Sequence, residues 1–252
     1  MNRKQPPFFV GYLPVPKQLA LFLLVCALSL VAGFAGAGLL AGATQDDPGK
    51  GDFRFDLGRQ TVTGVIELTP YPVLRVTIGN DHIPAGRTLM LSGIGKNGVT
   101  ERAAPLAGRM ATASGVLLSR GDLDMLQLRA GEAGLAAAAG VAPQMPVVPL
   151  GKWRLAGEIC DGKCLAGAMR PGRGLAHKAC ANLCLIGGVP PVFVSSQPVD
   201  GNSFFLIAGP DGGPMPARAY DFVGQYIILE GEIERRGDLP VLRISLPTLE
   251  VL

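Results

Sequence analysis

The sequence lacks the short motifs on which most enzyme classes depend. Only two histidines, one tryptophan and four tyrosines occur in 252 residues. The chain contains no GxSxG nucleophile turn, no HExxH zinc motif, no Walker loop and no CxxCH haem-attachment signature. These absences argue against a hydrolase, a nucleotide-driven enzyme and a c-type cytochrome. They favour a role without catalysis.

Acidic residues are missing from residues 1–43, and residues 19–43 contain no charged residue of either sign. A helix of about 20 apolar residues crosses the hydrocarbon core of a bilayer, so residues 19–43 are predicted to form a transmembrane helix. The basic residues of the region all precede this run, in residues 1–18. The positive-inside rule therefore predicts a cytoplasmic segment at 1–18 and a chain that is periplasmic from residue 44 onward, in a bacterial inner membrane. A cleaved signal peptide ending near Ala43 is the alternative.

The predicted membrane helix is rich in small residues in its second half. Gly33, Gly38 and Gly42 lie there, and Gly38 and Gly42 form a GxxxG pair. Small residues at this spacing let another helix approach closely. The sequence therefore predicts partners among other membrane-protein subunits, in addition to the lipid bilayer.

Excess positive charge is missing from the exported portion. The net charge of the whole chain is +3, and Arg3, Lys4 and Lys17 account for it. Nucleic-acid binding needs a basic stripe. We therefore expect no nucleic-acid partner.

The exported portion contains an internal duplication. Residues 89–128 align without a gap on residues 205–244, and ten of the 40 aligned positions are identical. The opening strands, 62–68 and 155–161, align at an offset of 93 instead of 116, so the second copy holds about 23 extra residues. Short apolar runs separated by Gly-Asp turns are typical of antiparallel strands.

The predicted fold is mainly β, with two tandem small barrels after the membrane helix. The barrels are expected at 44–130 and 151–252, and the closing segment 223–244 resembles the end of an OB-type barrel. Residues 131–150 are rich in alanine and proline and are predicted to be a linker, with a short helix at 133–139.

The extra residues of the second copy form a cysteine-rich insertion at 160–186, predicted to be partly helical. It contains four of the five cysteines, Cys160, Cys164, Cys180 and Cys184, together with His177 and Met169. Thiols, imidazole and thioether bind soft metals or carry redox chemistry.

Three interpretations of this set stay open. An oxidising compartment and an even number of exported cysteines favour two disulfides, most easily built between the 160/164 pair and the 180/184 pair. The loop would then dock on a partner whose acidic groups meet Arg170, Arg173 and Lys178. Copper or zinc binding by the cysteines, with His177 and Met169 as further ligands, is the second interpretation. Thiol–disulfide redox chemistry is the third, because the segment holds five basic neighbours and one acid.

Two resemblances concern this segment. The CxxxC spacing in an anchored exported protein is similar to that of the copper chaperones that serve cytochrome oxidase, and with a histidine it is similar to dinuclear copper centres. The pattern GEICDxKCxxGxMxPGxGxxHKxCAxLCxxGGxPP, at 157–191, resembles one found in membrane-anchored bacterial periplasmic proteins with an OB-like barrel. That second resemblance implies an exported bacterial barrel protein and supplies no reaction.

Taken together, the sequence predicts a non-catalytic, single-pass accessory or assembly subunit of a bacterial membrane complex, of the electron-transfer kind. The alternative is a periplasmic metal-binding or thiol-redox protein that uses the Cys/His cluster.

Overall fold

The computed structural model describes residues 15–44 and 49–252. The chain divides into two units, Met1–Asp47 and Pro48–Leu252. In the first unit, α1 (Lys17–Thr44) contains one stretch, Lys17–Ala41, that is long and apolar enough to cross a membrane. The predicted membrane helix is therefore confirmed as a helix of the required length and composition. Arg3 and Lys4 lie outside the described residues.

Glycines of α1 face open space within this chain. A Cβ added at Gly33 or Gly38 would meet nothing within 4 Å in this chain. Gly42 belongs to the same helix. The predicted packing of another helix against these glycines stays a prediction.

The second unit is mainly β and begins with a seven-stranded sheet, here called the N-terminal sheet. Its strands are β1 (Asp52–Phe53), β2 (Gln60–Leu68), β3 (Pro72–Ile78), β4 (Thr88–Ser92), β5 (Met110–Arg120), β6 (Leu123–Leu128) and β7 (Leu135–Ala137). The strand order is β1-β5-β2-β3-β4-β6, and a further pairing joins β5 to β6.

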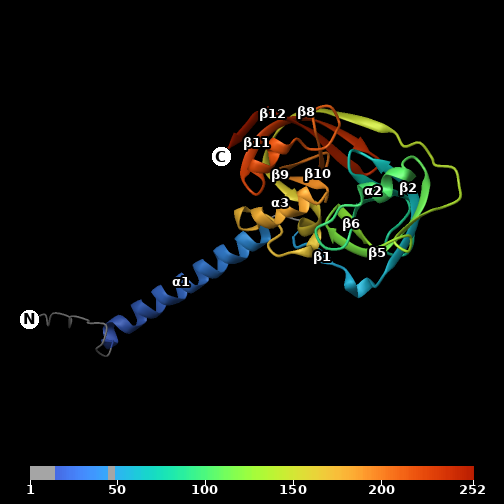
Figure 1. Ribbon diagram of the computed structural model, residues 1–252. Coiled ribbons are helices and arrows are strands. Elements are labelled where there is room, and N and C mark those ends of the chain that lie inside the picture. The colour runs from blue at the N-terminus through green and yellow to red at the C-terminus, as the bar shows by residue number, and fades with distance from the viewer. Residues whose placement is uncertain (1–14, 45–48) are drawn as a thin grey trace, which may run out of the picture. The chain divides into compact units, whose positions relative to one another are not determined.

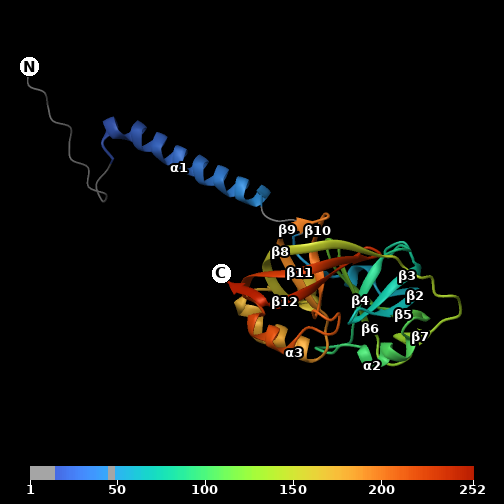
Figure 2. The same cartoon turned by 90° about the horizontal axis from the view of Figure 1, so that it is seen from above.

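The remaining strands form a closed five-stranded barrel, here called the C-terminal barrel. They are β8 (Val147–Asp161), β9 (Pro191–Val199), β10 (Asn202–Ala208), β11 (Tyr226–Arg236) and β12 (Leu239–Val251). The barrel closes in the order β10-β12-β11-β8-β9. Figures 1 and 2 show the N-terminal sheet and the C-terminal barrel side by side.

Strand pairing repeats between the two sheets at the offsets found in the sequence. Gly115 pairs with Leu128 in the N-terminal sheet, and 116 residues later Gly231 pairs with Ile244 in the barrel. The parallel pairing of Met90 with Met125 recurs as Leu206 with Val241. The duplication found in the sequence is therefore also present in the strand pairing of the structure.

The opening strands follow their own offset of 93. Gly64 pairs with Ala111, and Gly157 pairs with Ile227. A Cβ on Gly64 would lie 1.9 Å from the carbonyl oxygen of Arg75, and one on Gly157 would lie 2.1 Å from that of Val194. Glycine is therefore required at this position in both copies because the next strand passes too close for a side chain.

The copies differ in the connection after the opening strand. Residues 69–71 join β2 to β3, whereas residues 162–190 join β8 to β9. The longer connection, here called the insertion, contains all of the extra residues. Its helical elements are η3 (Cys164–Ala168), η4 (Leu175–His177) and α3 (Lys178–Ile186). The remaining short helices of the unit are η1 (Phe55–Leu57), α2 (Thr100–Ala103), η2 (Ala104–Leu106) and η5 (Ala217–Phe222).

The predicted linker at 131–150 is partly strand. The short helix expected at 133–139 is wrong, because Leu135–Ala137 form β7 and pair with β5. Residues 147–150 begin β8 and pair with β11. The cause is an open edge: β6 pairs with β5 only from Gly115 onward, so residues 111–113 have unpaired backbone groups on the edge opposite β2, and a short extended segment satisfies them.

Three hydrophobic cores hold the second unit together. One fills the N-terminal sheet and one fills the C-terminal barrel. The third core lies between them and combines Val73 and Met125 from the sheet with Phe204 from the barrel and Cys164 and Leu165 from the insertion. Part of the insertion is therefore buried between the two sheets.

Candidate metal centre

Four short elements of the C-terminal repeat carry the cysteine-rich set. Cys160 and Asp161 end β8, and Cys164 begins η3 three residues later. A carboxylate oxygen of Asp161, Oδ1, accepts the backbone N–H of Cys164 at 2.8 Å and so turns the chain away from the strand. His177 ends η4, and α3 carries Cys180 and Cys184. The prediction that the insertion is partly helical is therefore confirmed.

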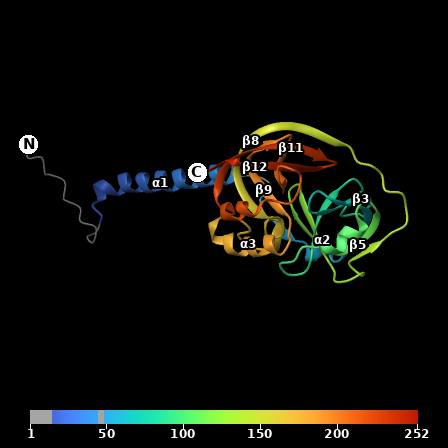
Figure 3. The same cartoon turned by 45° about the horizontal axis from the view of Figure 1, so that its top comes forward.

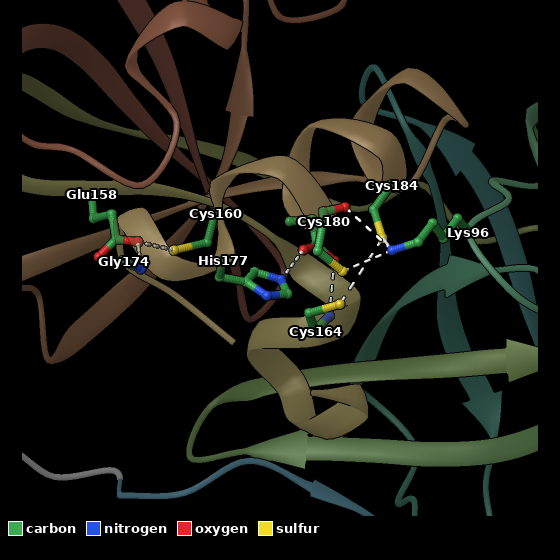
Figure 4. A network of polar contacts seen from close by, with 9 residues as sticks. Lys96, Glu158, Cys160, Cys164, Gly174, His177, Cys180 and Cys184 are labelled. Atoms are coloured by element: carbon green, nitrogen blue, oxygen red, sulfur yellow. Dashed lines mark hydrogen bonds and ion pairs between the residues drawn. The ribbon is translucent and has the colours of Figure 1, made fainter. Parts of the chain in front are cut away.

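Three thiols converge at the junction of η3 and α3. The sulfur atoms of Cys164, Cys180 and Cys184 all lie within 4.8 Å of one another, as Figure 4 shows. Cys164 and Cys184 are buried, and Cys180 is half-buried. Residues four apart in a helix lie on the same face, which explains why both α3 cysteines point toward Cys164.

The spacing of the sulfurs fits ligands of one metal ion better than a disulfide. The Sγ atoms of Cys164 and Cys184 are 3.9 Å apart. A disulfide requires about 2.05 Å between sulfurs. Zinc–sulfur bonds of about 2.3 Å place two sulfurs of one ion about 3.8–4.0 Å apart. The observed separation therefore matches a metal site without movement of the backbone.

A buried histidine–carboxylate pair adjoins the thiols. His177 Nε2 lies 3.1 Å from Asp161 Oδ2, and both side chains are buried. In the neutral tautomer that donates Nε2–H to a carboxylate acceptor, Nδ1 has a free lone pair. Asp161, Cys164 and His177 form a second group whose ligand atoms lie within 4.8 Å of one another. A carboxylate that orients a histidine in this way is typical of metal sites.

Cys160 has a different chemical environment from the other three cysteines of the set. Its thiol donates to the carboxylate of Glu158 at 3.2 Å, and it belongs to neither ligand group. Burial, and then the charge of Glu158, raises the pKa of the Cys160 thiol well above its usual range. All five cysteines are free in this structure. The prediction of two disulfides therefore finds no support here, because Cys160 is directed to Glu158.

The other predicted site residues do not join the thiols. Met169 is half-exposed and lines the cavity described below. Arg170, predicted to meet an acidic partner, is ion-paired with Asp52 of the same chain at 2.7 Å. Lys178 donates to the backbone oxygen of Asp221. Arg173 is exposed and lines a cavity described below.

Two lysines lie near the thiols, and the sequence analysis did not predict that both belong to the same site. Lys96 belongs to the loop that follows β4, and its Nζ lies 2.7 Å from Cys180 Sγ and 3.7 Å from Cys184 Sγ. Lys163 is buried and donates to the carbonyl oxygens of Gly93 and Gly95 in the same loop. Nothing in the sequence relates residues 93–98 to the insertion. Only the shared core brings them together.

The contacts around the thiols favour thiolate at Cys184 and disfavour it at Cys164. The hydrogen bond from Cys164, with the positive charge of Lys96, lowers the pKa of Cys184, although burial opposes this effect. The same hydrogen bond, together with burial, raises the pKa of Cys164. Contact with Cys180 raises the pKa of Lys96. One proton is thus shared between two thiols beside a cation, and an incoming metal cation would replace it.

Comparison with protein families, with curated proteins and with solved structures finds no match for this chain. The chemistry of the site is therefore argued from its geometry.

Proposed function

We propose that this protein is a membrane-anchored binding protein for a soft metal ion, copper(I) or zinc, held by Cys164, Cys180 and Cys184. The observation that carries this proposal is the convergence of three sulfurs within 4.8 Å, with a 3.9 Å edge that fits sulfur ligands of one ion. Thiolate ligands select copper(I) and zinc over hard cations.

His177 is the candidate fourth ligand. Asp161 holds its Nε2, which leaves Nδ1 available on the side chain that already neighbours Cys164. The two lysines, Lys96 and Lys163, supply the positive charge that several thiolates need when they are buried together. When bound, the metal would supply a fixed positive charge that keeps all three thiols deprotonated.

The cysteine set itself supplies the test of the metal site. The detergent-solubilised full chain would be loaded with zinc or with copper(I) under reducing conditions, and bound metal measured by mass spectrometry of the elements. We expect one ion per chain in the wild type and in Cys160→Ser. Cys164→Ser, Cys180→Ser and Cys184→Ser should each lose most of it. Equal loss in Cys160→Ser would contradict the assignment, since that thiol faces Glu158.

Thiol–disulfide chemistry at Cys164 and Cys184 is the competing proposal for the same atoms. The lowered pKa of Cys184 favours it. Alkylation of the unfolded, unreduced chain with a chelator present distinguishes the two, with Cys26 counted separately. Four modified cysteines in the second unit support metal binding, whereas two unmodified residues, identified as Cys164 and Cys184, support a redox pair.

The scaffold of this site is inferred to be a tandem OB-like barrel pair in the periplasm. Support for the fold comes from the matched pairings of the two sheets, including the parallel pairs β4–β6 and β10–β12. Support for the location comes from the charge asymmetry around α1. A cysteine-accessibility experiment on intact cells, with a membrane-impermeant reagent and a cysteine placed at exposed Val141, tests the orientation.

We also propose that the protein acts as an accessory or assembly subunit of a membrane complex, for which the metal site would serve delivery or storage. The glycines of α1 favour this role, because they leave room for a neighbouring helix. Gly38→Leu should reduce co-purification of other membrane subunits after mild solubilisation, while a wild-type protein that purifies alone would contradict the role.

A further inference from the structure

A cationic cavity lies at the start of the second unit, away from the thiols. It has a volume of about 350 Å³ and is lined by residues 49–51, by Arg120 at the end of β5 and by residues 169–173 of the insertion. Four basic side chains line it: Lys50, Arg120, Arg170 and Arg173. Its size is within the range of small-molecule sites.

Arg120 is the least satisfied of these four cations. Its Nε is buried and has no hydrogen-bond partner among the described residues. Its guanidinium lies over the ring of Phe204, 5.9 Å from the centroid. Burial, followed by repulsion from Arg173, lowers the pKa of Arg120. Two guanidinium groups that repel each other beside a cavity would both be stabilised by an anion between them.

Carboxylates of the described residues leave this charge incompletely balanced. Asp52 is already paired with Arg170. Glu158 lies near Arg120, but it accepts the thiol of Cys160 and the backbone N–H of Gly174. Two acids therefore face four cations: Asp52 is paired with one of them, Arg170, and Glu158 has other partners.

Apolar side chains complete the cavity. Leu165 and Met169 line it beside the arginines, and Met169 is 48% exposed. Gly49 follows the last residue of α1, Thr44, by only five positions in the sequence. Cations beside apolar surface, a few residues after a membrane span in the sequence, suit an amphipathic anion better than a free one.

We propose that this cavity binds the phosphate group of an anionic phospholipid at the membrane surface. Arg120 and Arg173 contact the phosphate oxygens, Lys50 adds charge at the rim, and Leu165 and Met169 contact the glycerol and the first acyl carbons. The site is independent of the metal centre, since it uses none of the three converging thiols.

The full chain in nanodiscs tests the proposal. Discs of phosphatidylcholine mixed with phosphatidylglycerol would be compared with discs of phosphatidylcholine alone, and lipid retained by the protein measured by native mass spectrometry. We expect one retained phosphatidylglycerol per chain. Arg173→Gln should reduce retention about tenfold, the loss of one charge-assisted contact. Arg218→Gln, which removes an exposed cation of the C-terminal repeat, should leave it unchanged.

Arg120→Gln should show the same loss, and the exposed Arg173 keeps the test decisive if the Arg120 variant does not fold. Equal retention of the two lipids, or retention of added inorganic phosphate in place of lipid, would overturn the proposal. Asp46 and Asp47 precede the cavity in the sequence and lie outside the described residues. If only the variant Asp46→Asn/Asp47→Asn retains phosphatidylglycerol, the chain's own carboxylates fill the cavity and the proposal also fails.

Discussion

The two repeats of the second unit share strand pairing but differ most in the connection that follows their first strand. In the N-terminal repeat, three residues join the first two strands, and no thiol is present. In the C-terminal repeat, residues 162–190 make the same connection and carry His177 and three of the four thiols. The fourth thiol, Cys160, lies in β8. The comparison teaches that a cysteine-rich connection can be added to one copy of a duplicated β unit while the matched strand pairings are kept.

The plain repeat is nevertheless part of the site. Its loop at 93–98 supplies Lys96 to Cys180 and two carbonyl oxygens to Lys163. The backbone N–H of Gly98 donates to the carbonyl oxygen of Gly187 at 2.7 Å, directly after α3. Figure 3 shows α3 beside the C-terminal barrel. The C-terminal repeat carries the candidate ligands, and the loop at 93–98 of the N-terminal repeat contacts them.

The largest expected effect comes from the core between the repeats. Leu165 is 1% exposed and Leu183, in the same insertion, is 58% exposed. Leu165→Ala should lower the free energy of unfolding by about 2–5 kcal/mol because it leaves a cavity, whereas Leu183→Ala should change it by less than about 0.5 kcal/mol. Urea unfolding of the solubilised full chain measures both. Equal effects would mean that the insertion is not part of the shared core.

A smaller loss is expected where the two repeats touch through glycine. A Cβ on Gly98 would lie 2.0 Å from the carbonyl oxygen of Gly188, so Gly98→Ala must push the loop away from the insertion. We expect a loss of about 1–3 kcal/mol of stability and weaker metal retention. Gly213→Ala is the matched control, because its nearest neighbour is the Asp211 side chain at 3.1 Å. Unchanged metal retention in Gly98→Ala would show that the loop at 93–98 does not contribute to the metal site.

The contribution of the plain repeat to thiol chemistry can be measured through pH. Lys96 lowers the pKa of Cys184, so its removal in Lys96→Met should raise that pKa. Metal binding releases thiol protons, and the pH at which half of the metal is bound should therefore move upward. Lys96→Arg keeps the positive charge, so its midpoint should move upward less than that of Lys96→Met. Lys152→Met, at an exposed lysine, should show no shift of the midpoint. An unchanged midpoint in Lys96→Met would show that the lysine does not act on the thiols.

The smallest effect is expected at the ion pair between Arg170 and Asp52. Both side chains are more than half exposed, and such pairs contribute about 0–1 kcal/mol. Arg170→Gln should therefore lower stability by less than about 1 kcal/mol at moderate salt. A larger loss in thermal unfolding would mean that this contact, like the buried core, holds the repeats together.

Sequence reasoning captured the repeat because its constraints are local. Gly64 and Gly157 are each fixed by a neighbouring strand that leaves no space for a side chain. Gly121 and Gly237 each have a positive φ in the hairpin turn after the long strand. These positions recur at fixed spacing, so an alignment of the chain with itself reveals them.

The meeting of the two repeats could not be predicted in the same way. Cys160 and Cys164 look equivalent in the sequence, yet the end of β8 turns between them and sends one thiol to Glu158 and the other to Cys184. Lys96 resembles any loop lysine until the shared core places it beside Cys180. Contacts between distant segments depend on how surfaces fit, and no local pattern records that fit.

The core between the repeats also sets a timescale. Cys184 is 2% exposed, and Gly98 is bonded to the chain directly after its helix. If the proposed ion binds there, a chelator would reach this buried thiol through a local opening, for which lifting of the loop at 93–98 is the candidate motion, and exchange would follow the rate of that opening rather than the rate of encounter. The residence time of the proposed ion would then depend on the plain repeat.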